Sequence, residues 1–202
     1  MTFHDIDCKD AWRRRVLHVR KQQTIDDRDR ASWRIADHIG KVARPGQAVA
    51  AYVPMDSEPG SVAMLDALVD AGVQVLLPFT VVNSPLSWAL YTGPADLSPA
   101  AFGLREPTGP DLGPGGLARA DAIIVPALAV DCRGVRLGRG AGYYDRSLAM
   151  VDGDVPLIAV VNDAELVDAL PDEPHDIRMT HALTPSGGLQ ALVPAEFVGS
   201  RT

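Results

Sequence analysis

Residues 49–53 read Val49-Ala50-Ala51-Tyr52-Val53, a short apolar run without polar alternation. Such a run is typical of a strand that other elements cover on both faces. Further apolar runs predict strands at 73–79, 88–91, 122–125, 157–161 and 182–184. Strands that alternate with helices predict an α/β fold: a three-layer α/β/α sandwich around a mostly parallel, Rossmann-like sheet.

The helical segments have recognisable starts and ends. Thr24 resembles an N-cap, and the acidic residues after it suit the positive end of a helix dipole. Gly72 is expected to end a helix as a C-cap. The predicted helices span 9–22, 24–40, 60–71, 142–150 and 164–170. We expect one domain over residues 1–202, with an irregular connection at 92–119 and a mobile tail after about residue 186.

The composition excludes several classes of partner. The chain has 202 residues and 47% hydrophobic content, which suits one domain with a full core. Its net charge of −7 argues against a nucleic-acid partner, and no apolar run approaches the length of a membrane span. Cys8 and Cys132 match no metal-binding spacing and predict free thiols in a reducing compartment. We therefore expect a cytoplasmic monomer with a small anionic ligand.

Residues 136–146 carry the strongest functional signal, the run Arg-Leu-Gly-Arg-Gly-Ala-Gly-Tyr-Tyr-Asp-Arg. Its alternate glycines let backbone N–H groups converge, and arginines beside such groups attract phosphate. Asp145 is of the residue type that holds Mg²⁺ together with a nucleoside triphosphate. Two alternatives to a triphosphate cradle remain open: a Gly-rich surface turn, and a dinucleotide fingerprint with Glu165 as the ribose-binding acid.

Other familiar sites lack their required residues. The chain has no lysine after Lys41, so it contains no P-loop, and no GxSxG elbow is present. Lys9 and Arg13, four residues apart, share a helix face, where a solvated basic face is the alternative to an anion site. Asp56 and Glu58 follow a predicted strand, where ligand groups of parallel sheets lie; exposed acids at a helix start are the alternative. His175-Asp176 alone would be a surface pair.

Taken together, these segments resemble the 5-formyltetrahydrofolate cyclo-ligase family, also called 5,10-methenyltetrahydrofolate synthetases. The resemblance covers about residues 9–185, and the run at 136–145 is highly specific to that family. The weaker matching motifs occur in the family's order: Lys9-x-x-x-Arg13, Thr24-x-x-x-Arg28, Tyr52-Val53-Pro54 to Glu58, Leu76-Leu77-Pro78, Gly103 to Pro107, Ile123 to Pro126, Asp131, Leu170-Pro171 and His175-Asp176.

The resemblance implies that ATP phosphorylates the formyl oxygen of 5-formyltetrahydrofolate, with Mg²⁺ as cofactor. N10 then closes the ring to 5,10-methenyltetrahydrofolate, and ADP and phosphate are released. Arg139, Tyr143 and Glu58 would act in catalysis, and Asp145 and Asp176 would hold Mg²⁺. The family's ATP-binding positions fall on Lys9, Arg13, Arg136, Leu137, Gly138, Arg139, Gly140, Ala141, Gly142, Tyr143 and Tyr144. Its folate-binding positions fall on Val53, Glu58, Arg139, Gly140, Ala141, Gly142 and Tyr143.

The sequence departs from the family pattern at Ala127, Ala141, Glu165 and Thr180. The methyl of Ala141 is harmless where φ is negative and costly where φ is positive. An ionised Glu165 would repel phosphate, so we expect it to face away or to pair with an arginine. Two alternative functions stay open: a non-ligase α/β enzyme that binds a sugar phosphate or dinucleotide, and a catalytically silent folate- or nucleotide-binding module.

Overall fold

The computed structural model describes residues 8–55, 57–151, 153–174 and 176–192, with the side chain of residue 102 left aside. Asp56 and His175 lie outside the described residues, as does the tail from 193. The centre of the fold is a seven-stranded sheet in the order β12-β11-β9-β6-β1-β2-β3. Its strands are β1 (Ala48–Ala50), β2 (Gln74–Phe79), β3 (Ser87–Tyr91), β6 (Ala122–Pro126), β9 (Leu157–Val160), β11 (His181–Thr184) and β12 (Gly188–Ala191).

The five central strands are parallel, as the apolar runs predict. The pairs β11–β9, β9–β6, β6–β1 and β1–β2 are all parallel, whereas β3 and β12 pair antiparallel at the two edges. Side chains of successive residues in β1 enter different cores: Val49 packs on one side of the sheet and Ala50 on the other. Both faces are therefore buried, which explains the lack of polar alternation.

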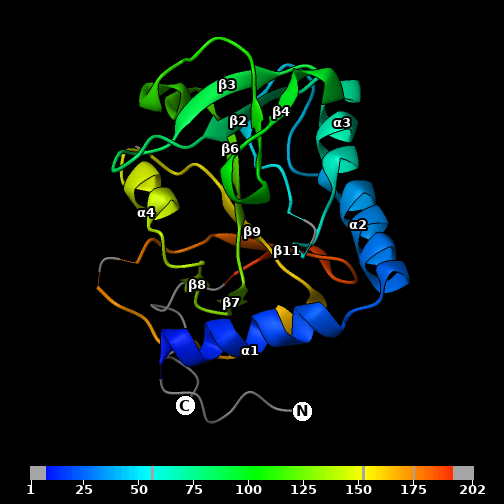
Figure 1. Cartoon of the computed structure of the whole chain (residues 1–202), viewed down its shortest axis with the longest axis vertical. Coiled ribbons are helices and arrows are strands. Elements are labelled where there is room, and N and C mark those ends of the chain that lie inside the picture. Colours follow the sequence, from blue (N-terminus) through cyan, green and yellow to red (C-terminus); the bar gives the residue numbers. More distant parts are fainter. Residues whose placement is uncertain (1–7, 56, 152, 175, 193–202) are drawn as a thin grey trace.

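Helices cover the sheet on two sides, as Figure 1 shows. One side is covered by α2 (Ile25–Ile39) and α3 (Val62–Asp70), and the other by α4 (Tyr143–Leu148) with the 3₁₀ turn at 114–119. The Thr24 hydroxyl accepts a hydrogen bond from the Asp27 N–H at 3.1 Å, which confirms the expected N-cap. The three-layer α/β/α sandwich is confirmed.

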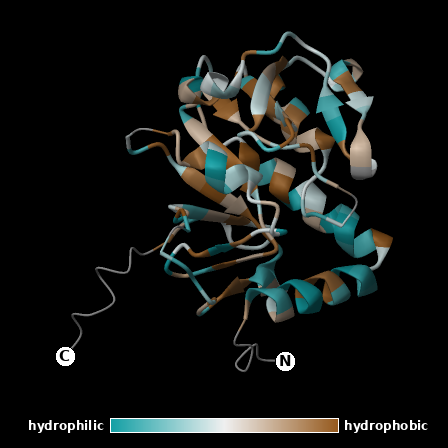
Figure 2. Cartoon of the chain, turned by 60° about the vertical axis from the view of Figure 1, so that its left-hand side comes forward, coloured by the Kyte–Doolittle hydropathy of each residue, from teal (hydrophilic) through white to brown (hydrophobic). Residues whose placement is uncertain are grey.

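The N-terminal helix α1 (Lys9–Gln22) lies apart from these layers, along a small sheet in the order β10-β7-β8. Its strands are β7 (Ala129–Asp131), β8 (Arg136–Leu137) and β10 (Leu166–Val167). Trp12 and Val16 bury their side chains against Leu128, Ala129 and neighbouring residues. Figure 2 shows that hydrophobic residues concentrate in the strands, while most of α1 is hydrophilic. Helix α1 therefore offers one apolar stripe to the domain and exposes Arg14 and Lys21, whereas Arg20 is buried. In the described part of the chain, no helix combines the length and apolar composition needed to cross a membrane.

Three predicted segments differ from the structure. Residues 164–170 are not a helix, because Asn162 and Glu165 cap a single 3₁₀ turn and β10 (Leu166–Val167) then pairs with β7 (Ala129–Asp131). Residues 188–191 do not belong to a mobile tail, because they form β12, which pairs with β11. The connection at 92–119 is partly regular: it contains the hairpin of β4 (Leu97–Pro99) and β5 (Arg105–Pro107).

Candidate active site

A cavity of about 740 Å³ opens at the carboxyl ends of the central strands. Its lining includes Tyr52 and Val53 after β1, Thr80 after β2 and Ala127 after β6. Strand β1 lies between β2 and β6, so the chain changes direction across the sheet at this point. Such a switch point is where open α/β sheets bind ligands. The fold alone therefore predicts the position of this cavity.

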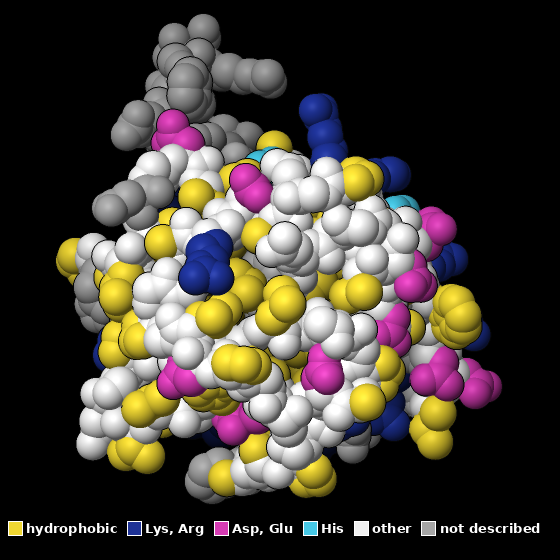
Figure 3. Space-filling model, turned by 90° about the horizontal axis from the view of Figure 1, so that it is seen from above, with side chains coloured by type: hydrophobic (Ala, Val, Ile, Leu, Met, Phe, Trp, Pro, Cys, Tyr) yellow, Lys and Arg dark blue, Asp and Glu magenta, His cyan; other side chains and the backbone are white. Residues whose placement is uncertain are grey.

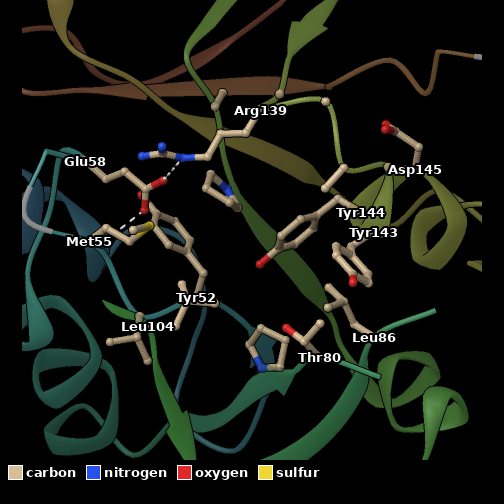
Figure 4. A pocket seen from close by; sticks show the side chains of 18 of the residues that line it. Tyr52, Met55, Glu58, Thr80, Leu86, Leu104, Arg139, Tyr143, Tyr144 and Asp145 are labelled. Atoms are coloured by element: carbon tan, nitrogen blue, oxygen red, sulfur yellow. Dashed lines mark hydrogen bonds and ion pairs between the residues drawn. The ribbon is translucent and has the colours of Figure 1, made fainter. Parts of the chain in front are cut away.

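The lining divides into an apolar part and a charged part. Tyr52, Leu86, Leu104 and Tyr143 contribute aromatic and aliphatic side chains, as Figure 4 shows. The glycine loop (residues 138–142) contributes backbone N–H groups. The charges come from the side chains of Glu58, Arg136, Arg139 and Asp145. A planar ring system suits the first part and an anion suits the second. One cavity can thus hold an aromatic ligand next to a phosphate.

The glycine loop runs from the end of β8 (Arg136–Leu137) to the start of α4. Gly140 has φ +97° and Gly142 has φ +69°, which are conformations that glycine adopts without strain. Ala141 between them does not have a positive φ: among the described residues other than glycine, only Asn83 does. The methyl group of Ala141 is therefore compatible with the loop.

Arg139 and Glu58 join the loop to the segment after β1. Arg139 Nε donates to Glu58 Oε1 at 3.1 Å, and the backbone N–H of Met55 donates to Glu58 Oε2 at 3.1 Å. The Glu58 side chain is 8% exposed, whereas that of Arg139 is 41% exposed. The carboxylate is thus held in place from two sides, while the guanidinium stays partly exposed and its Nη2 lies 3.5 Å from Ser57 Oγ.

Arg136 forms a second ion pair within the cavity wall. Its Nη2 donates to Asp145 Oδ1 at 2.6 Å, and its guanidinium lies 5.8 Å from the centre of the Tyr144 ring. The Arg136 side chain is 5% exposed, and its Nε has no hydrogen-bond partner among the described residues. Burial, with a smaller contribution from Glu58, raises the pKa of Tyr144 well above its usual value. The Tyr144 phenol therefore stays protonated and can donate to an anion.

Lys9 and Arg13, the residues of α1 that the resemblance assigns to ATP, reach different partners. Arg13 Nε donates to the carbonyl of Gly138 at 3.0 Å, so this helix contacts the glycine loop directly. Lys9 Nζ lies 2.8 Å from Asp176 Oδ2 and 3.2 Å from Glu173 Oε2. Burial lowers the pKa of Lys9, but the hydrogen bonds and charges of these two carboxylates outweigh it and raise the pKa. The described residues that line the cavity do not include Lys9, Arg13 or Asp176.

The sequence-predicted metal ligands each lie beside a basic residue. Asp145 lines the cavity next to Arg136, and Asp176 is bound by Lys9. The described residues contain no group of three or more His, Cys, Asp or Glu side chains placed to hold a metal ion. Mg²⁺ in nucleotide enzymes commonly takes one or two protein carboxylates, with phosphates and water as its other ligands. The donor set fits Mg²⁺ that arrives with a nucleotide, rather than Mg²⁺ in an all-protein site.

The departures from the family pattern at Glu165 and Thr180 are accommodated structurally. Glu165 is buried and accepts two hydrogen bonds from Arg20, each at 2.7 Å, so it pairs with an arginine as expected. Thr180 accepts from the backbone N–H of Leu157. The dinucleotide interpretation is not supported, because Glu165 is occupied by Arg20 and the strand β8 before the loop belongs to the small sheet.

Sequence reasoning missed the wall that the β4–β5 hairpin contributes. Ala101, Leu104, Arg105 and Glu106 all line the cavity. The motif Gly103 to Pro107 marks this segment, but its strands of three residues carry no periodic pattern from which a hairpin could be predicted.

Comparison with known proteins gives a consistent result. A family model described as the 5-formyltetrahydrofolate cyclo-ligase family matches residues 5–185. A 5-formyltetrahydrofolate cyclo-ligase from Mycolicibacterium smegmatis is 52% identical over 152 residues, which is 73% of this chain and 78% of the relative. The Escherichia coli protein of the same name is 31% identical over 181 residues, covering 86% of this chain and 95% of that protein.

Solved structures agree in fold. The solution structure of the Aquifex aeolicus 5,10-methenyltetrahydrofolate synthetase matches with a TM-score of 0.74 and 29% identity. It covers 91% of this chain and 92% of that one. A Mycoplasma pneumoniae protein described as a 5,10-methenyltetrahydrofolate synthetase matches with a TM-score of 0.66 and 19% identity. The match covers 85% of this chain and 94% of that one, and at this identity it supports the fold alone. The chain belongs to the 5-formyltetrahydrofolate cyclo-ligase family of enzymes.

Proposed function

We propose that this chain converts 5-formyltetrahydrofolate to 5,10-methenyltetrahydrofolate with ATP and Mg²⁺, releasing ADP and phosphate. The observation that carries the proposal is that one cavity joins an aromatic and apolar chamber to an arginine-rich glycine loop. A reduced pterin with its aminobenzoyl ring fits the first part, and a triphosphate fits the second. Family membership supplies the reaction.

The folate end of the cavity is assigned to Glu58 and the residues around it. Glu58 is held by the Met55 N–H and points toward Arg139 (Figure 4). A fixed carboxylate accepts hydrogen bonds from the amino and ring N–H groups of a pterin. Val53 and Tyr143 would complete the contact with the ring system. The formyl group on N5 would then lie toward the glycine loop.

The phosphate end is assigned to the loop and to helix α1. Arg136, Arg139 and the N–H groups of residues 138–144 would bind the triphosphate, and Arg13, which touches the loop at Gly138, would join them. Lys9 would be released from Asp176 toward the phosphates. Asp145 and Asp176 would hold Mg²⁺, and the positive charge of the ion would neutralise negative charge on the phosphates. Phosphoryl transfer requires positioning and charge neutralisation more than a protein nucleophile.

The reaction has two chemical steps. The formyl oxygen attacks the γ-phosphorus, and the bond to the bridging oxygen of ADP breaks. N10 attacks the activated carbon and loses its proton, and the carbon–oxygen bond breaks as phosphate leaves. Arg139 stabilises the charge on the transferring group, and the Tyr143 phenol, at the start of α4, contacts the folate side of the loop.

The charge of the whole chain agrees with small anionic substrates. A net charge of −7 disfavours a polymer such as nucleic acid, while the loop gathers local positive charge. Within the proposal the enzyme acts as a cytoplasmic monomer.

The proposal is tested by incubating the purified chain with 5-formyltetrahydrofolate, ATP and Mg²⁺ and following the absorbance of the methenyl product. We expect product only when all three are present. A silent binding module would give ligand binding without product, and a sugar-phosphate or dinucleotide enzyme would give neither.

A further inference from the structure

Arg105 lines the cavity without engaging any carboxylate of the described chain. It lies on β5 of the hairpin and is exposed, and its side chain forms none of the ion pairs or hydrogen bonds found among the described residues. Its cross-strand partner is Pro99, which carries no charge. By contrast, Arg13, Arg20, Arg136 and Arg139 each bind a carboxylate. Arg105 is therefore available to an anion that enters from outside.

The surroundings of Arg105 favour a ligand with an apolar body and an anionic end. Leu104, the preceding residue, places its side chain in the cavity beside Tyr52 (Figure 4). The carboxylate of the next residue, Glu106, accepts a hydrogen bond from the Thr80 N–H at 2.9 Å. This bond holds the carboxylate at the end of β2. Figure 3, viewed from the side where β3 and β4 lie, shows that basic side chains are sparse there. A single cation in this setting recognises a carboxylate rather than a polyphosphate.

The position of Arg105 separates it from the phosphate end. Leu104 lies across the cavity from Asp145, which marks the end assigned to ATP and Mg²⁺ (Figure 4). Arg105 follows Leu104 directly on the hairpin, whereas Arg136 lies in β8 and Arg139 follows that strand. The anion that Arg105 meets is thus a different one from the triphosphate.

We infer that Arg105 is a specificity-determining residue that binds the carboxylate of the substrate's glutamate tail, with the aminobenzoyl ring packed on Leu104. The inference rests on the proposed function and assigns one further contact in the same cavity. With the pterin ring at Glu58 and the formyl group toward Arg139, the remaining part of the folate is its aminobenzoyl-glutamate arm. That arm consists of an apolar ring followed by carboxylates, which match Leu104 and Arg105 in the cavity wall.

The test compares two substrates that differ only in the tail: 5-formyltetrahydrofolate, and 5-formyltetrahydropteroate, which lacks glutamate. For Arg105→Gln we expect kcat/KM with the folate to fall roughly three- to tenfold, the range of a partly exposed charge pair with a bidentate partner. With the pteroate, kcat/KM should be the same for the variant and the parent chain. Arg105→Lys should recover part of the loss, and the KM for ATP should not change.

The matched control is Arg119→Gln, since Arg119 is also exposed but lies outside the cavity lining. It should leave kcat/KM with both substrates unchanged. An equal fall with both substrates for Arg105→Gln, or no fall with the folate, would overturn the inference. Failure of the proposed function is distinguishable, because the parent chain would then form no methenyl product from either substrate.

Discussion

The guanidinium of Arg139 and the carboxylate of Glu58 form an ion pair, with 3.1 Å between Nε and Oε1, although 81 positions separate them in the chain. One residue belongs to the loop assigned to ATP and the other to the segment assigned to folate. The contact therefore brings the two substrate regions together at one point. In our account the formyl oxygen and the γ-phosphate meet beside this pair.

Arg139→Ala should slow turnover by about 10²- to 10³-fold, which is typical for loss of one donor that stabilises transition-state charge. The measurement is kcat with saturating ATP and 5-formyltetrahydrofolate. Arg119→Ala, which removes an exposed arginine outside the cavity, is the matched control and should retain full activity. Near-normal kcat for Arg139→Ala would remove Arg139 from the chemical step.

Asp145→Asn should increase the Mg²⁺ concentration needed for half-maximal activity, by about tenfold or more. An amide is a weaker ligand than a carboxylate, and the substitution also removes the charged partner of Arg136. A Mg²⁺ titration at fixed ATP measures the shift, with Asp154→Asn, an exposed carboxylate outside the cavity lining, as control. Superimposable titrations for Asp145→Asn and the parent chain would argue against metal binding at Asp145.

The glycine loop allows a paired test of backbone conformation. Gly140→Ala introduces a side chain at φ +97°, and its Cβ would lie 3.4 Å from the guanidinium carbon of Arg13. We expect a loss of about 1–3 kcal/mol in the free energy of unfolding, measured with urea. Ala141→Gly, at the neighbouring position without positive φ, should cost less than about 1 kcal/mol. Equal effects at both positions would contradict the conformations described here.

The buried pair of Arg20 and Glu165 fixes α1 to the domain. Both side chains are almost fully buried, and Arg20 also donates to the carbonyl of Ala127 at 2.8 Å. Arg20→Met should lower the free energy of unfolding by about 3–5 kcal/mol, because it leaves the buried Glu165 carboxylate without its cationic partner. The double variant Arg20→Met with Glu165→Leu should recover much of that loss. Urea unfolding that shows additive losses in the double variant would show that the two residues are not coupled.

Much of the fold could be predicted because its signals are local. The run Val49 to Val53 has no polar alternation since both faces of the sheet are covered, and Thr24 caps its helix through a contact three residues away. The hairpin at 97–107 and strand β12 depend on partners that only the folded chain provides. Local periodicity therefore could not predict them.

The sequence predicts which residues form the candidate site better than it predicts the contacts among them. The spacing of glycines and arginines at 136–146 marks the loop, and the family resemblance adds Glu58 and Lys9. The pairing of Arg139 with Glu58, and the place of Arg105 in the cavity wall, arise from long-range packing. The sequence predicts that Glu165 faces away or pairs with an arginine, but its partner Arg20 lies 145 positions away and follows from how α1 packs.

Transfer of the formyl oxygen tests the central claim most directly. If the formyl oxygen attacks the γ-phosphate beside Arg139, that oxygen leaves the folate within the released phosphate. The measurement uses 5-formyltetrahydrofolate labelled with ¹⁸O in the formyl group and determines the label in phosphate by mass spectrometry. Our account predicts one labelled oxygen in each phosphate released. Methenyl product formed together with unlabelled phosphate would contradict it.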